Sequence, residues 1–169
     1  YLHHRDYDES YLTSALPAAV ADRERIRSWT IRTILKPGVW GSGLDGLLKS
    51  LHQDIRASEG PFPLEAIRST MAVRGKALTF DDELLDALLD TPYKHQRTFA
   101  LLSLLFDWVD TRNDFHIDHV FPRSLVTEGM LRGQGLTDPL IHEIRDRVER
   151  LANLQLLPGA ENVSKSATM

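Results

Sequence analysis

Cysteine is absent from the 169-residue sequence, and so is any long apolar run. Without thiols the chain can form neither disulfides nor thiolate metal sites, which is typical of a reducing cytoplasm. The longest apolar run, FALLSLLF at residues 99–106, has eight residues, whereas a membrane-spanning helix needs about 20. The opening YLHHRDYDES lacks the basic and then apolar order of a signal peptide. We therefore expect a cytoplasmic protein with no membrane partner.

An initiator methionine is also missing, so we expect the chain to be a piece of a longer protein. Its length suits one domain, or one domain and a small additional module. Apolar residues make up 42% and charged residues 26% of the sequence, values that exclude disordered and low-complexity classes. The composition therefore predicts a globular protein.

Net negative charge does not exclude a nucleic-acid partner here. The formal net charge is −4, but residues 119–169 hold six Lys or Arg and six Asp or Glu, so the acidic excess lies wholly in residues 1–118. A neutral region can bind DNA if a metal ion and a few local cations face the phosphates.

Apolar residues recur at helical spacing through most of the first 110 residues. We expect helices over about 22–35, 44–55, 64–71 and 96–108, and a further helix for which Thr79 and Asp82 form a capping box. These apolar stripes are interpreted as the core of a helical bundle rather than as a cofactor site.

The pattern changes after Trp108. TRND at residues 111–114 is a polar turn, and residues 115–121 alternate enough to predict a strand. Asp138 is the expected N-cap, and Pro139 the expected first residue, of a helix that runs to about residue 150. A second strand is expected at residues 154–157 and a final helix near Asn162.

The stretch FHIDHVFPRS, residues 115–124, concentrates groups that can hydrolyse a phosphodiester. A histidine, with an ordinary pKa of about 6.5, can take a proton from water, and a divalent cation can neutralise the developing charge. Asp118 offers the oxygen ligand that such a cation prefers, and His119 is its neighbour. Adjacent strand residues face opposite ways, so both can face one ligand only if the backbone bends there or His119 lies in the turn at Pro122. His116 and Asp118 share a face.

Together with NLQLLPGAENVSKS at residues 153–166, this stretch resembles the HNH, or ββα-metal, nuclease motif. The resemblance implies that His119 is the general base and that Asp118 and Asn162 hold Mg²⁺ or Mn²⁺. It also implies that the Asn153 side chain ties the loop after the first strand and so orients His119. The structural zinc of some HNH proteins is not expected, because cysteine pairs are absent.

Three further residues are candidates for phosphate or DNA binding by the same resemblance. Lys165 lies one helical turn beyond Asn162, where its alternative is an ordinary surface lysine. Arg123 would contact the DNA backbone. His116 is a phosphate contact, a third metal ligand or a buried support.

Much of residues 20–166 also resembles the C-terminal half of GmrSD-type restriction endonucleases, and the SspE-like defence proteins share that plan. The stretches that carry this resemblance are ILKPGVWGSGLDGLLKSL, FPLEAI and TPYKHQRTFALLSLLF. It implies a bacterial anti-phage enzyme that cleaves DNA, including phage DNA, with an N-terminal ParB-like nucleotide-binding domain ahead of this chain. The expected fold is mainly α, with a helical region over residues 1–110 and an HNH motif over residues 111–169.

Two other functions stay open at this point. The chain could be a DNA-binding or regulatory helical module with a vestigial nuclease site, although His119, Asp118 and Asn162 are all present. It could also be a structural or partner-binding helical domain whose HIDH segment binds a transition metal through His116 and His119. For the nuclease, a single site nicks one strand, and a homodimer or a second event is needed to break both.

Overall fold

The computed structural model describes residues 1–106, 108–110 and 112–159. Packing contacts divide the chain into two compact units, Tyr1–Phe80 and Asp81–Met169. Helices α5 and α6 belong to the second of these units. The predicted division into a helical region over residues 1–110 and an HNH motif over residues 111–169 stays a prediction. No helix in the described part of the chain is both long and apolar enough to cross a membrane.

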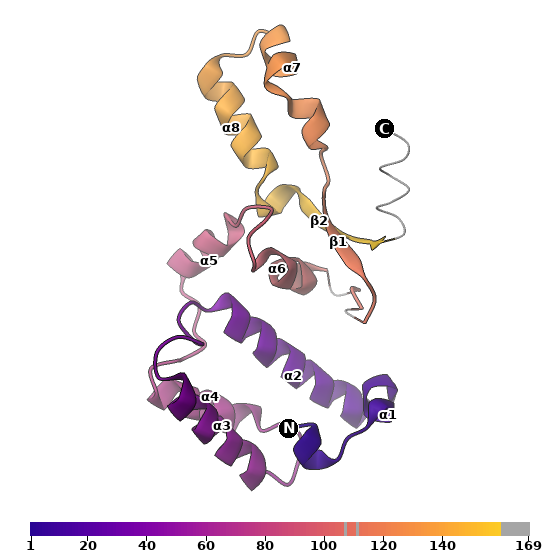
Figure 1. Ribbon diagram of the computed structural model, residues 1–169, viewed down its shortest axis with the longest axis vertical. Helices are drawn as coiled ribbons and strands as arrows, with labels where there is room; N and C mark the ends of the chain where they lie inside the picture. Colours follow the sequence, from indigo (N-terminus) through magenta and orange to yellow (C-terminus); the bar gives the residue numbers. More distant parts are fainter. Residues whose placement is uncertain (107, 111, 160–169) are drawn as a thin grey trace. The chain divides into compact units, whose positions relative to one another are not determined.

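The first unit consists of helices and turns (Figure 1). Its elements are η1 (His3–Arg5), α1 (Glu9–Thr13), α2 (Pro17–Leu35), α3 (Leu44–Ala57) and α4 (Leu64–Val73). Helix α2 begins at Pro17, five residues before the predicted start, because proline suits the first helical position. The buried core joins α3 and α4 to the loops around them through Val39, Leu47, Leu51, Phe62, Ile67 and Met71.

The second unit combines two leading helices with a β-hairpin that is interrupted by a helical excursion (Figure 1). Its elements are α5 (Asp82–Leu89), α6 (Thr98–Leu105), β1 (Phe115–His119), η2 (Arg123–Val126), α7 (Glu128–Gly133), α8 (Asp138–Val148), η3 (Leu151–Asn153) and β2 (Leu154–Pro158). The predicted class, mainly α followed by a small two-stranded hairpin, is confirmed. The predicted final helix near Asn162 lies outside the described residues.

Several predicted boundaries in this unit were wrong. Asp81, not Thr79, caps α5, since its carboxylate accepts a hydrogen bond of 2.9 Å from the Leu84 amide. Thr137 is the N-cap of α8, and Asp138 is the first helical residue. Helix α6 is shorter than predicted at both ends, and β1 ends at His119 because the chain bends at Val120.

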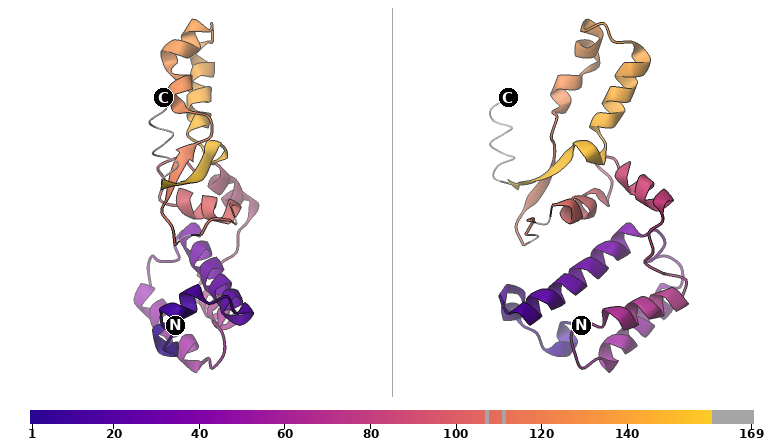
Figure 2. Two further views of the ribbon diagram at one scale, coloured as in Figure 1. Left: turned by 90° about the vertical axis from the view of Figure 1, so that its right-hand side faces the viewer. Right: turned by 180° about the vertical axis from the view of Figure 1, so that it is seen from behind.

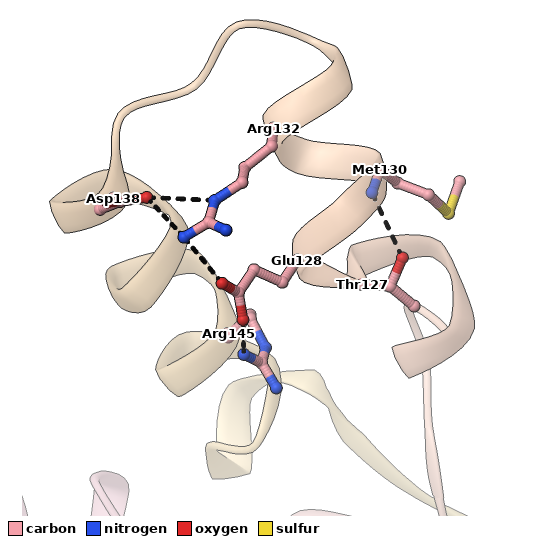
Figure 3. Close-up of polar contacts among 6 residues, drawn as sticks. All are labelled: Thr127, Glu128, Met130, Arg132, Asp138 and Arg145. Atoms are coloured by element: carbon pink, nitrogen blue, oxygen red, sulfur yellow. Dashed lines mark hydrogen bonds and ion pairs between the residues drawn. The ribbon is translucent and has the colours of Figure 1, made fainter.

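The excursion between the strands is a pair of helices, α7 and α8, that run side by side (Figures 1 and 2). Its small core is apolar and consists of Val126, Leu131, Ile141 and Val148, with Leu136 and Ile144 packed against it. Outside this core, Glu128 pairs with both Arg132 (2.8 Å) and Arg145 (3.3 Å), and Arg132 also pairs with Asp138 (Figure 3). Exposed pairs of this kind contribute little individually, so the apolar core is the main stabilising feature.

Candidate active site

The β-hairpin separates the two central residues of the HIDH stretch. β1 and β2 are antiparallel, and the register pairs Asp118 with Gln155 and His119 with Leu154. Strand alternation therefore places Asp118 on the face of Gln155, whose Nε2 lies 3.4 Å from Asp118 Oδ2. His119 faces the opposite, buried side with Leu154. Both alternatives that would have turned Asp118 and His119 to one side are wrong, because His119 is the last residue of a regular strand.

His119 is enclosed by groups from two distant segments. Only 7% of the residue is exposed, and the Tyr93 ring packs against the imidazole at 4.5 Å between centroids. The Nε2 atom of His119 lies 3.6 Å from Oε2 of Glu149, the C-cap residue directly after α8. The imidazole is therefore held between an aromatic ring and a carboxylate.

Asn153 ties the chain that follows β1 to the chain that enters β2. Its Oδ1 accepts a hydrogen bond from the Phe121 amide (2.8 Å), and its Nδ2 donates to the Phe121 carbonyl (3.0 Å). Nδ2 also donates to the Val148 carbonyl (2.9 Å), and the Asn153 carbonyl accepts from the Val120 amide (2.8 Å). These bonds hold the bend directly after His119, while the predicted effect on His119 orientation stays a prediction.

Asn153→Ala is expected to loosen this bend without unfolding the unit. Three side-chain hydrogen bonds are lost, but water can reach the exposed Phe121 backbone, so we expect a cost of about 1–2 kcal/mol. The sharpest measurement is amide hydrogen exchange, which should accelerate at Phe121. Asn113→Ala, at an exposed asparagine ahead of β1, is the control. Unchanged exchange at Phe121 in Asn153→Ala would contradict the role of the Asn153 side chain in holding this bend.

The opposite face of β1 carries Asp118 and His116. Asp118 is partly buried, whereas His116 is exposed and is therefore not a buried support. A Cβ atom at Gly159 would lie 3.6 Å from His116 Nε2, so this imidazole sits close to the end of β2. Asn162 and Lys165 lie outside the described residues.

The donor chemistry on this face fits a hard divalent cation. Mg²⁺ takes one or two carboxylates from a protein and completes its shell with water and substrate oxygens. Asp118 supplies one such oxygen donor. Within residues 1–159, the two gaps aside, no group of three or more His, Cys, Asp or Glu side chains could hold a metal ion.

Arg123, a candidate for DNA binding, is 57% exposed at its side chain and pairs through Nε with Glu149 Oε1 at 2.6 Å. Both residues line a cavity of about 630 Å³ beside α8. The acidic residues Glu128 and Asp146 line the same cavity. The arginines of α7 and α8 pair with carboxylates as well. The excursion is therefore not a uniformly basic surface, and Arg123 lies four residues after the end of β1.

Tyr93 and Glu149 were missed by the sequence analysis. Tyr93 lies in an irregular segment between α5 and α6, where no periodicity marks it. Glu149 does carry a signal, because a carboxylate at the C-terminal end of a helix opposes the helix dipole and calls for an explanation.

Comparison with known proteins identifies the family of this chain through one family model. No curated protein matches the chain significantly. The family model of GmrSD restriction endonucleases, C-terminal domain, matches residues 78–169, which is more than half of the chain and includes the whole β-hairpin. The chain therefore belongs to the family of GmrSD restriction endonuclease C-terminal domains, which are HNH-type nuclease domains.

Proposed function

We propose that the chain is a metal-dependent DNA endonuclease module that acts against phage DNA in a bacterial restriction system. The observation that carries the proposal is the hairpin itself: Asp118 and His119 end β1, and Asn153 clamps the bend that follows them. Membership of the restriction endonuclease family supports DNA as the substrate. Cleavage would be a nick at a single site, and a homodimer would be needed to break both strands together.

Within this proposal His119 is the general base. Its imidazole takes a proton from the attacking water, a role that a positioned histidine can fill near neutral pH. Asp118 and Asn162 would hold Mg²⁺ or Mn²⁺ through oxygen atoms. When bound, such a cation stabilises the negative charge on the phosphoryl and leaving oxygens. Because Asp118 and His119 face opposite ways, the scissile phosphate would bind across the end of β1, where the chain bends.

The remaining candidates would contact the DNA backbone. Arg123 and Lys165 supply cations for phosphate oxygens, and His116 lies on the same face of β1 as Asp118. Since the surrounding surface is not uniformly basic, the ParB-like domain expected ahead of this chain would supply further affinity and the gating of cleavage by DNA modification.

The hairpin geometry argues against one alternative, the transition-metal site. His116 and His119 are three residues apart in a regular strand and therefore face opposite sides. A transition-metal site that uses both as ligands does not fit β1. The vestigial-site alternative is an outcome of the experiment below.

Asp118→Ala is expected to remove metal-dependent cleavage of supercoiled plasmid. The wild-type chain should convert plasmid to nicked or linear DNA in Mg²⁺ or Mn²⁺ and should stop when the metal is chelated. Loss of a ligand for the charge-neutralising ion should slow cutting at least about 100-fold. Asp114→Ala, at an exposed aspartate just before β1, is the matched control.

A second readout makes the metal assignment independent of activity. Mn²⁺ should broaden the NMR amide signals of Asp118 and Gln155 by paramagnetic relaxation, and Asp118→Ala should lose this effect. Broadening without plasmid cleavage would favour the vestigial alternative. A wild-type chain that shows no broadening and no plasmid cleavage would contradict the proposal of a metal-dependent nuclease.

A further inference from the structure

The carboxylate of Glu149 lies between His119 and Arg123. Its Oε2 is 3.6 Å from His119 Nε2, and its Oε1 is 2.6 Å from Arg123 Nε. The first distance is within ion-pair range and slightly longer than a hydrogen bond, as catalytic contacts often are before substrate binds. We propose that Glu149 is a positioning residue, whose carboxylate accepts the Nε2–H of His119 and sets the tautomer of the ring. This inference rests on the proposed role of His119 as general base.

Tautomer choice matters because a neutral imidazole has one donor and one acceptor nitrogen. A carboxylate at Nε2 favours the form in which Nε2 carries the hydrogen and Nδ1 carries the lone pair. In that form Nδ1 is the atom that takes the proton from water. Glu149 touches neither water nor phosphate in this scheme, and acts only through the His119 ring.

The segment around Tyr93 contacts both Glu149 and His119 and so positions one relative to the other. The Tyr93 amide donates to the Glu149 carbonyl at 2.7 Å, while the Tyr93 ring packs on His119. Neighbouring contacts strengthen this junction: Pro92 and Arg150 form an antiparallel bridge, and the Leu151 amide donates to the Thr91 carbonyl at 3.0 Å. Glu149 and His119 are thus located relative to one another by more than their own contact.

Helix stability does not explain a glutamate at this position. Glu149 is the C-cap of α8, where the helix dipole is negative and a carboxylate is unfavourable. Arg123 offsets this charge and also fixes one carboxylate oxygen, so that the other is directed at His119. The Glu149 side chain thus contacts both His119, the proposed general base, and Arg123, a candidate for phosphate binding.

The deciding experiment reads the His119 tautomer directly. Long-range ¹H–¹⁵N NMR spectra of the 169-residue chain distinguish the two neutral imidazole forms from each other and from imidazolium, and His119→Gln identifies the His119 signals. We expect one Nε2–H tautomer in the wild type and a mixture in both Glu149→Ala and the isosteric Glu149→Gln. Glu143→Gln is the matched control, because Glu143 lies on α8, the helix that Glu149 caps, and also pairs with an arginine at 2.6 Å.

Kinetics supply the second readout. We expect Glu149→Gln to lower kcat for plasmid cleavage about tenfold to a hundredfold, as loss of an orienting carboxylate usually does, with KM nearly unchanged. An unchanged His119 tautomer in both Glu149 variants, or an Nδ1–H form in the wild type, would overturn the inference. Equal cleavage by the wild type and His119→Ala would instead overturn the proposed function, and the tautomer spectra would still report the contact.

Discussion

His119→Ala is expected to slow plasmid cleavage by a factor of about 100 to 10,000, the usual contribution of a positioned general base. The reason is specific to this side chain, since His119 is the residue of β1 that lies against both Tyr93 and Glu149. The measurement is the initial rate at which supercoiled plasmid is lost in Mg²⁺, with enzyme in excess so that chemistry is observed.

Folding must be separated from catalysis in this variant, because removing a buried ring leaves space beside Tyr93. His119→Gln retains most of the volume and should lose cleavage to a similar extent. His142→Ala, at an exposed histidine on α8, should cut like the wild type. Amide NMR spectra would show whether each variant keeps the hairpin. A folded His119→Ala protein that retains a tenth or more of the activity would contradict the base assignment.

Asp22→Asn is expected to destabilise the first unit by about 3 kcal/mol. The Asp22 carboxylate is buried and accepts hydrogen bonds from Tyr1 Oη (2.7 Å), Tyr11 Oη (2.8 Å) and the Phe62 amide (2.6 Å). An amide cannot accept all three equally well, and hydrogen bonds to a buried charge are worth about 1.5–3 kcal/mol each. The measurement is denaturant unfolding followed by tryptophan fluorescence in a Trp108→Phe background, which leaves Trp29 and Trp40 of the first unit as reporters.

The effect of Asp22 should depend on pH in a defined direction. Burial alone raises the pKa of Asp22, but the hydrogen bonds from Tyr1, the Phe62 amide and Tyr11 outweigh it, so the pKa lies below its ordinary 3.8. A lowered folded-state pKa means that the stabilisation is complete above the unfolded-state value and is lost as pH falls through the folded-state value. The difference between wild type and Asp22→Asn should therefore shrink below about pH 4.

Two controls define what would contradict this account. Tyr11→Phe removes one of the donors to Asp22 and should cost about 1–2 kcal/mol. Glu24→Gln changes an exposed carboxylate on the same helix, 61% exposed at its side chain, and should stay within about 0.5 kcal/mol of the wild type. An Asp22→Asn protein as stable as Glu24→Gln at neutral pH would rule out the carboxylate as the anchor.

Local patterns allowed most of the elements to be predicted. The stripe of leucines from Leu44 onward predicted α3, and the alternation around Ile117 predicted β1, because helix and strand periodicities are properties of neighbouring residues. Cap positions were less predictable. Thr79 and Asp81 are both acceptable N-caps by residue type, and only the hydrogen bond to the Leu84 amide distinguishes them.

For the candidate site too, one part could be predicted from the sequence and another could not. Its motif residues could be located because His116, Asp118 and His119 lie within four consecutive residues and Asn153 stands directly ahead of the second strand. The direction in which His119 points could not, since it depends on whether the strand continues through residue 119 or bends before it. In the structure, pairing with Leu154 keeps His119 in β1 and turns it to the buried face.

The residue order alone was thus enough to identify a mainly helical chain with an HNH-type motif and to list the groups that could do the chemistry. It could not reveal that Tyr93 and Glu149 enclose His119 or that Arg123 shares Glu149 with it. These partners come from a loop before β1 and from the end of α8, far from His119 along the chain. They meet only because residues 90–93 pair with the segment that enters β2, and such long-range contacts are set by packing rather than by any local pattern.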